Sequence, residues 1–228
     1  MEYLHNGFTL ELCEDAFPLS TDSIALSGFA ILPRQAKVLD LGSGCGTLGL
    51  LLCASDPGCT VTGIELNENA HHMALHNITT NNLGSRLASI CADLRTVPSF
   101  LTAGSFHCCV SNPPYFSAGQ KSANSCARHE LSCSLDELFS AASWAVHYGG
   151  DFFLVHKPDR LSELCVSAVK HGFEPKRLQF LRHHPGENIS LILLQCRKGA
   201  KPGLIIEEKY LKESNGQPSD YYRKLYHI

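Results

Sequence analysis

A strand, a glycine-rich turn and a helix are expected in direct succession between residues 37 and 54. Residues 37–41 form a short apolar run, residues 42–46 read Gly-Ser-Gly-Cys-Gly, and residues 47–54 are rich in leucine. Glycine adopts backbone conformations that other residues avoid, so it permits the tight turn and lets a ligand approach the backbone. This order predicts an open, mostly parallel α/β sheet that binds its ligand at the carboxyl ends of its strands.

The spacing of the three glycines, Gly42, Gly44 and Gly46, narrows the class of ligand. A phosphate-binding loop has the pattern G-x-G-x-x-G, whereas this chain has D-x-G-x-G-x-G beginning at Asp40. A carboxylate at this point repels a pyrophosphate but pairs with an ammonium group or accepts a hydrogen bond from it. We therefore expect an aminoacyl nucleoside rather than a dinucleotide; the alternative is a plain tight turn.

Two further acids close predicted strands. Glu65 follows a strand expected at residues 59–64 and lies about 20 residues beyond the glycine turn, where a carboxylate can accept hydrogen bonds from both hydroxyls of a ribose. Asp93 follows a short strand expected at residues 89–92. It is placed to accept a hydrogen bond from an adenine amino group or, alternatively, to cap a helix. Both acids are thus expected at the edge of the sheet that carries the glycine turn.

A fourth strand, expected at residues 106–110, ends in Asn112-Pro113-Pro114-Tyr115. Neither proline has an N–H to donate, so the strand cannot continue its hydrogen-bond ladder and a stiff loop follows. The side-chain oxygen of Asn112 and the carbonyl of Pro113 can both accept hydrogen bonds from an –NH2 group, while Tyr115 stacks on a planar ring. The alternative is a strand-terminating turn with a surface tyrosine.

The remaining segments complete a single expected domain over residues 1–228. A hairpin and a helix occupy residues 1–33, with Thr21 or Asp22 capping a helix at residues 24–32 or abutting the charged end of a ligand. Further strands are expected at residues 151–155, 176–181 and 189–196, and further helices at residues 67–82, 135–147 and 161–171. We expect a loop at residues 116–134 and a basic tail at residues 199–228. The fold is therefore expected to be a mostly parallel seven-stranded sheet with helices on both faces.

Composition excludes several classes of protein. No apolar stretch reaches the roughly 18 residues that a membrane span needs, and the amino terminus lacks a basic region followed by an apolar core. Eleven cysteines are scattered without a Cys-x-x-Cys pair, so we expect buried thiols in a reducing cytoplasm and no metal site. The net charge is −3, but residues 156–228 hold 13 Lys and Arg against 8 Asp and Glu. A locally basic half is weak support for a phosphate-bearing partner.

These motifs together resemble the class I S-adenosylmethionine-dependent methyltransferases that carry an Asn-Pro-Pro-Tyr motif, which have a Rossmann-like fold. Residues 8–10, 20–22, 127–130 and 197–204 are similar to the bacterial tRNA1(Val) (adenine-N6)-methyltransferases, which modify adenine 37 beside the anticodon. Ser20, where that family often has glycine, and Cys45 in the glycine turn depart from the pattern. We expect cofactor contacts from Thr21, Asp40, Gly42, Gly44, Gly46, Glu65, Asp93 and Asn112, catalytic roles for Asn112, Pro113 and Tyr115, and substrate contacts from Pro114, Tyr115 and Arg128.

The resemblance implies a tRNA partner and S-adenosylmethionine as cofactor. We expect a monomer, and we assign no catalytic histidine, because an amine that loses its proton only as it becomes positively charged needs no strong general base. Phosphate contacts are expected from Lys121, Arg128, Arg197, Lys198 and Lys201, unless these are ordinary surface charges. Three alternatives remain open. A protein glutamine methyltransferase acts on a side-chain amide, which presents the same –NH2 group to the same loop. A non-catalytic RNA-binding protein could retain the cofactor fold, and an NAD-dependent oxidoreductase is opposed by the glycine spacing and Asp40.

Overall fold

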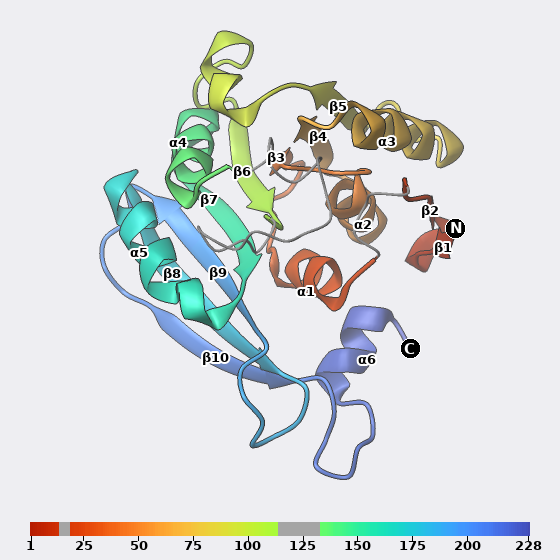
Figure 1. Cartoon of the computed structure of the whole chain (residues 1–228), viewed down its shortest axis with the longest axis vertical. Coiled ribbons are helices and arrows are strands. Elements are labelled where there is room, and N and C mark those ends of the chain that lie inside the picture. Colours follow the sequence, from red (N-terminus) through yellow and green to blue (C-terminus); the bar gives the residue numbers. More distant parts are fainter. Residues whose placement is uncertain (14–18, 114–132) are drawn as a thin grey trace, which may run out of the picture.

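The computed structural model describes residues 1–13, 19–113 and 133–228. The expectations for Pro114, Tyr115, Lys121 and Arg128 lie outside the described residues. Within the described part, eight strands form one sheet that is flanked by helices (Figure 1). The expected fold class is confirmed, and the expected strand count of seven is wrong by one.

The main sheet runs in the spatial order β10-β8-β9-β7-β6-β3-β4-β5. Its strands are β3 (Lys37–Leu41), β4 (Thr60–Glu65), β5 (Leu87–Cys91), β6 (Phe106–Ser111), β7 (Val146–His156), β8 (Phe173–Arg182), β9 (Leu191–Lys198) and β10 (Ile205–Tyr210). Only β9 runs antiparallel to its two neighbours. Because β3, β4 and β6 are parallel neighbours, the ends of these three strands meet at one edge, which we call the carboxyl edge.

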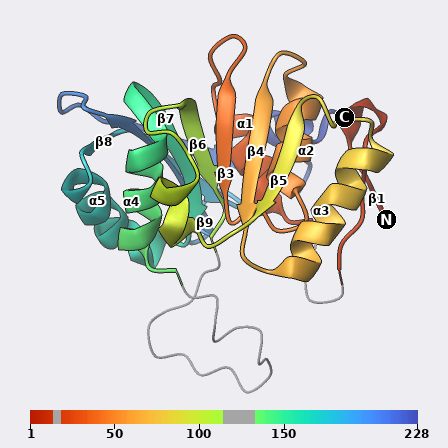
Figure 2. The same cartoon turned by 90° about the horizontal axis from the view of Figure 1, so that it is seen from above.

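Helices cover both faces of the sheet. They are α1 (Thr21–Phe29), α2 (Thr47–Ser55), α3 (Glu68–Thr80), α4 (Leu135–Ala145), α5 (Leu161–Lys170) and α6 (Asp220–Tyr226), with short 3-10 turns η1 (His5–Gly7), η2 (Leu94–Ser99) and η4 (Pro158–Arg160). Buried residues of α1, α2 and α3 pack in one cluster and those of α4 and α5 in a second cluster on the opposite face. Figure 2 shows α4 and α5 side by side over β7 and β8. No helix among the described residues is long and apolar enough to cross a membrane.

The alternation of aliphatic residues along β3 explains both clusters. Val38 packs on the side of α1 and α2, while Leu39 and Leu41 pack on the side of α4. Side chains of a strand alternate between its two faces, so a parallel strand between two helical layers must be apolar on both. Asp40 is the polar exception among the four buried residues of this strand, and its side chain is 1% exposed.

The amino-terminal region differs from expectation in its details. β1 (Glu2–Tyr3) and β2 (Thr9–Leu10) form the expected hairpin. The N-cap of α1 is Ser20 rather than Thr21 or Asp22, and it makes no side-chain capping bond. The helix ends at Phe29, before the expected residue 32, so the last apolar residues belong to the connection to β3.

The carboxyl-terminal thirty residues are not a tail. β10 adds an eighth strand parallel to β8 at the edge of the sheet, and α6 packs beside α1 (Figure 1). A Cβ atom added to Gly28 would lie 2.5 Å from the side chain of Leu225, so glycine at this position lets α1 and α6 approach closely. The tyrosine-rich end of the chain is therefore part of the packed structure on the α1 side of the sheet.

Candidate active site

The glycine turn between β3 and α2 forms an open backbone cradle at the carboxyl edge. Gly42, Gly44 and Gly46 have φ angles of +75°, +54° and +84°, a region that side-chain-bearing residues rarely adopt. The amides of Gly42 and Ser43 both donate to the carbonyl of Ile64, at 2.9 and 3.0 Å, which ties the turn to β4. A Cβ atom added at Gly42 or Gly44 would meet nothing within 4 Å among the described residues. The exposed side of the turn therefore faces space that a ligand can enter.

A fourth glycine, Gly63 in β4, lets the glycine turn pack closely against this strand. A Cβ atom at this position would lie 2.5 Å from the hydroxyl of Ser43, so any larger residue would push the turn away from the strand. That hydroxyl is buried and has no hydrogen-bond partner among the described residues. Neither residue was predicted from the sequence, although a lone glycine inside an apolar strand is a signal of close backbone approach.

Asp40 is the most unusual group of the site. Its side chain is 1% exposed, and neither carboxylate oxygen has a hydrogen-bond partner among the described residues. Burial raises the pKa of this carboxyl to about 8, and the charge of Glu65 adds to the rise. A buried carboxyl without a partner is costly. The structure therefore places an unsatisfied acid beneath the cradle, where a cationic or hydrogen-bond-donating ligand would stabilise it.

Glu65, at the end of β4, is already engaged by the backbone. Its Oε2 atom accepts from the amide of Gly44 at 2.7 Å, and its Oε1 atom accepts from the amide of Asn67 at 2.8 Å. One carboxylate thus links the glycine turn to the start of α3. A carboxylate oxygen has two acceptor positions, so both atoms retain capacity for ligand hydroxyls. The expected role toward a ribose stays a prediction, and the structure adds a second role that the sequence did not show.

Asp93 adopts the helix-cap alternative in this structure. Its carboxylate accepts from the amide of Arg95 at 2.9 Å and caps η2, and the Arg95 guanidinium contacts both oxygens at 2.5–2.9 Å. The hydrogen bonds from Arg95 hold the pKa of Asp93 below its ordinary value. Its expected contact with an adenine amino group stays a prediction, and any such contact must share the carboxylate with Arg95.

Asn112 lies against the first turn of α1. Its side-chain Nδ2 atom donates to the hydroxyl of Ser23 at 3.0 Å, across 89 residues of sequence. Asn112 and Pro113 follow β6 directly, so they stand at the same edge as the glycine turn, one strand away from it. The structure therefore brings the expected catalytic segment and the expected cofactor cradle to one edge.

Thr21, at the start of the same helix, contacts the end of the chain. Its hydroxyl lies 3.1 Å from the phenolic oxygen of Tyr226 in α6. The Thr21 hydroxyl therefore already has a hydrogen-bond partner within the protein. The expected cofactor role of Thr21 stays a prediction.

Three of the expected phosphate-binding cations lie at the edge of the sheet opposite the carboxyl edge. β9 runs antiparallel to β7, so Arg197 and Lys198 at its end face the amino ends of the parallel strands. Arg197 forms a two-point ion pair with Asp151, with both contacts at 2.9 Å, and the Lys198 ammonium donates to two backbone carbonyls. Lys201 follows them at the same edge. The topology thus separates these residues from the glycine turn, and the expected phosphate contacts stay a prediction for a surface away from the site.

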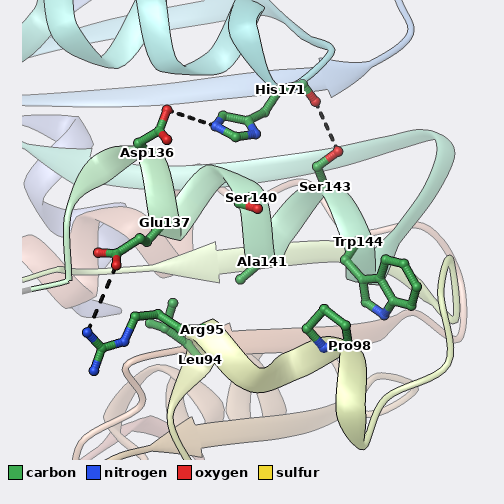
Figure 3. A pocket seen from close by; sticks show the side chains of 10 residues that line it. All are labelled: Leu94, Arg95, Pro98, Asp136, Glu137, Ser140, Ala141, Ser143, Trp144 and His171. Atoms are coloured by element: carbon green, nitrogen blue, oxygen red, sulfur yellow. Dashed lines mark hydrogen bonds and ion pairs between the residues drawn. The ribbon is translucent and has the colours of Figure 1, made fainter.

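A cavity of about 470 Å³ lies between η2 and α4 (Figure 3). Arg95 faces Glu137 at 3.9 Å on one side, and His171 contacts Asp136 at 2.9 Å on the other. These side chains have partners in the walls of the cavity, in contrast to Asp40. The cavity therefore lacks the unsatisfied group that marks the cradle, and we do not assign the active site to it.

Asn77 of α3 is a further residue that the sequence analysis missed. Its side chain is 1% exposed, and its Nδ2 atom donates to the carbonyl of Cys45 in the glycine turn at 2.9 Å and to that of Glu11 at 2.8 Å. A buried amide with its hydrogen bonds satisfied fixes the segments that it joins. Asn77 thus holds the turn from the side of α3.

The cysteines mostly behave as the composition indicated. Six of the ten described cysteines are buried, and burial raises the pKa of Cys45 to about 11, so that its thiol is protonated at neutral pH. The Cys45 and Cys13 sulfurs lie 3.7 Å apart as free thiols. In the described ranges, no group of three or more histidine, cysteine or acidic side chains is arranged to hold a metal ion.

A family model described as the methyltransferase small domain matches residues 25–169, which is more than half of the chain. The chain belongs to this family. The matched region runs from α1 through α5 and contains the glycine cradle, Asp40, Glu65 and Asn112.

Relatives refine the placement. The chain is 32% identical over 218 residues to the tRNA1(Val) (adenine(37)-N6)-methyltransferase of Aeromonas hydrophila subsp. hydrophila, covering 92% of this chain and 89% of the relative. It is 29% identical over 229 residues to the protein of that name from Bacteroides fragilis, covering 96% and 92%. A third, from Pseudoalteromonas translucida, is 32% identical over 160 residues, covering 69% and 67%. Within the methyltransferase family, the chain belongs with the group that carries this name.

Solved structures show the same fold. A predicted O-methyltransferase from Agrobacterium tumefaciens matches with a TM-score of 0.77 at 20% identity, covering 91% of this chain and 96% of that chain. TrmN from Thermus thermophilus matches with a TM-score of 0.56 at 19% identity, covering 77% and 48%. At these identities the likeness concerns the fold alone, and it agrees with the sheet order and layers described above.

Proposed function

We propose that the protein transfers a methyl group from S-adenosylmethionine to the N6 atom of an adenine in tRNA, at position 37 of valine tRNA. The observation that carries the proposal is the placement of Asn112 and the Asp40 cradle at one edge of the sheet. Relatives that span most of the chain bear the corresponding name, which supports the substrate. Because the substrate is tRNA, we also propose that the protein acts in the cytoplasm; as a separate proposal, we expect a monomer.

The residues at the cradle fit this cofactor. S-adenosylmethionine carries an ammonium group and a sulfonium charge on a nucleoside, and the buried, unsatisfied carboxyl of Asp40 suits a cationic neighbour. Gly42 and Gly44 leave the backbone open to close approach, and Glu65 has acceptor capacity for the ribose hydroxyls. The cofactor supplies a methyl group on a positively charged sulfur, which makes that carbon susceptible to displacement.

The chain's own contribution to chemistry is positioning. The exocyclic amine of adenine is conjugated with the ring and is a poor nucleophile. Hydrogen bonds from that amine to the Asn112 side-chain oxygen and the Pro113 carbonyl would favour tetrahedral geometry at nitrogen and expose its lone pair. The amine needs to lose a proton only after it has become positively charged, so no strong general base is required. The adenine must leave its stack to reach this corner, as bases in loops do.

The test is methylation of tRNA from a strain that lacks the protein. Total tRNA is incubated with the protein and S-adenosylmethionine labelled in the methyl group, and the nucleosides are then separated. We expect label in N6-methyladenosine derived from valine tRNA and none from a valine transcript in which adenine 37 is replaced by guanine. Label in protein instead of RNA would favour glutamine methylation, and label in another nucleoside would overturn the proposed target.

A further inference from the structure

The hydroxyl of Ser23 is a buried hydrogen-bond partner of the expected catalytic amide. Ser23 is 7% exposed and lies in the first turn of α1, and its Oγ atom accepts from Asn112 Nδ2 at 3.0 Å. It is not the N-cap of the helix, because that position belongs to Ser20. The contact joins α1 to the segment after β6, which the sheet alone does not connect.

We propose that Ser23 is a positioning residue that sets the orientation of the Asn112 amide. An amide group has a donor end and an acceptor end on opposite sides of one carbon. When Nδ2 is committed to Ser23, Oδ1 is directed away from α1, and the acceptor end is the one that an amino group requires. This inference rests on the proposed function, because it supplies the reason why the orientation matters.

The position of Ser23 is itself fixed by the end of the chain. Thr21, two residues earlier, contacts Tyr226, and Gly28 in the last turn admits Leu225 of α6. At the other end of α1, the Arg177 guanidinium lies 3.9 Å from the centre of the Phe29 ring and donates to the Phe29 carbonyl. Packing at both ends therefore restrains the helix that presents the hydroxyl.

The chain offers a matched control in the same helix. Ser27 lies one turn further along α1, and its hydroxyl donates to the carbonyl of Ile24 at 2.9 Å, a bond within the helix. Replacing Ser27 with alanine removes a serine hydroxyl from α1 without touching Asn112. Ser23→Thr retains the hydroxyl at the contact and serves as the conservative variant.

Two readouts test the proposal on the full-length protein. In the first, methyl transfer to valine tRNA is measured with cofactor affinity and melting temperature. Ser23→Ala is expected to lower kcat by about 10- to 100-fold, because small misplacements of reacting groups cost this much. Its cofactor Kd is expected to stay within about twofold of wild type, with kcat recovered largely in Ser23→Thr and unchanged in Ser27→Ala. Wild-type kcat in Ser23→Ala would overturn the proposal.

The second readout does not depend on activity. Nuclear magnetic resonance follows the two Nδ2 protons of Asn112, assigned by their disappearance in Asn112→Ala. Faster solvent exchange of these protons in Ser23→Ala, but not in Ser27→Ala, supports the contact, whereas equal exchange in both variants overturns it. If the wild-type protein methylates no tRNA while the exchange difference is present, the proposed function fails and the positioning of Asn112 stands.

Discussion

The two sides of the site differ in what the protein leaves unsatisfied. On the side of β3, the Asp40 carboxylate and the Ser43 hydroxyl are buried without partners among the described residues. On the side of β6, the amide of Asn112 is anchored to Ser23 before any ligand is considered. Unsatisfied charge favours binding, because a ligand removes its cost, whereas a fixed amide favours chemistry, because orientation is settled in advance. We therefore expect mutations on the two sides to separate affinity from turnover.

The largest expected effect lies on the β6 side. Asn112→Ala should lower kcat by about 10²- to 10³-fold, since it removes an acceptor that acts on the reacting nitrogen. Cofactor Kd, measured by calorimetry, should change little. Asn188→Ala alters an exposed asparagine in the loop after β8 and should leave both quantities at wild-type values. A large loss of cofactor affinity in Asn112→Ala would break the separation of the two sides.

On the β3 side, Asp40→Asn should act in opposite directions on binding and stability. Losing the anion should weaken S-adenosylmethionine by about 10- to 100-fold, as for a lost charge-assisted hydrogen bond. The ligand-free protein should instead gain stability, because a neutral amide avoids the cost of a buried carboxylate. A variant that is both weaker in binding and less stable at pH 8 would contradict this reading of Asp40.

The stability difference should depend on pH with a definite sign. The pKa of Asp40 is raised to about 8, so the folded protein holds a proton that the unfolded chain releases near its ordinary pKa of 3.8. Stability from this proton is complete below pH 3.8 and is lost as pH rises to about 8. Thermal unfolding of Asp40→Asn and wild type should diverge over this range, with Asn more stable, and then run parallel. Asp220→Asn, whose side chain is fully exposed, should show no such divergence.

Cofactor affinity should follow the same titration. Binding a cation beside Asp40 favours the ionised carboxyl, so association below pH 8 releases a proton. Wild-type affinity should increase with pH by at most about tenfold per unit and level off near the raised pKa. Calorimetry over this range tests it, with Asp40→Asn removing the contribution of this group. Equal slopes in the two proteins would show that another group titrates.

An effect of similar size on cofactor affinity is expected from Glu65→Gln. The amide retains one acceptor for the backbone but replaces the other with a donor, which opposes the amide of Gly44 or Asn67. Cofactor binding should weaken by about 1–3 kcal/mol, with kcat less affected. Glu68→Gln, at an exposed position on α3, is the matched control for loss of a nearby charge. Unchanged cofactor affinity in Glu65→Gln would remove Glu65 from the site.

The smallest expected effect concerns the contact between Tyr226 of α6 and Thr21 of α1. Tyr226→Phe removes the hydroxyl that meets Thr21 and keeps the ring, so it should cost about 0.5–1.5 kcal/mol of unfolding free energy. Tyr222→Phe should cost less, since its ring also stacks on Tyr226 but no hydroxyl contact of it is seen in the described structure. Chemical denaturation measures both, and an equal loss in the two variants would show that the contact with Thr21 does not add to stability.

Local patterns explain what the sequence predicted well. β3 was expected with its observed bounds, and the acids Asp40 and Glu65 were placed at strand ends, because aliphatic runs and glycine turns act over a few residues. For Asp93, the sequence left two roles open, a helix cap and a ligand contact. Arg95, two residues later, binds the Asp93 carboxylate and fixes it in the cap conformation. The effect of Arg95 was not considered when the two roles of Asp93 were predicted.

The missed features depend on contacts between distant residues. β10 (Ile205–Tyr210) is an edge strand whose side chains are exposed or half-buried. Its sequence therefore lacks the apolar run that marks a central strand. α6 is seven residues long, and its place is fixed by α1 rather than by its own periodicity. The pairing of Ser23 with Asn112 spans 89 residues and leaves no local signal. The antiparallel direction of β9, which also leaves no local signal, places Arg197 at the edge of the sheet opposite the glycine turn.

A crystal structure with S-adenosylhomocysteine, the unreactive product of methyl transfer, tests the central claim most directly. We predict electron density over Gly42 and Gly44, with the amino group toward Asp40 and the ribose hydroxyls on Glu65. Density in the cavity between η2 and α4, with the glycine cradle closed by side chains, would contradict the assignment of the site.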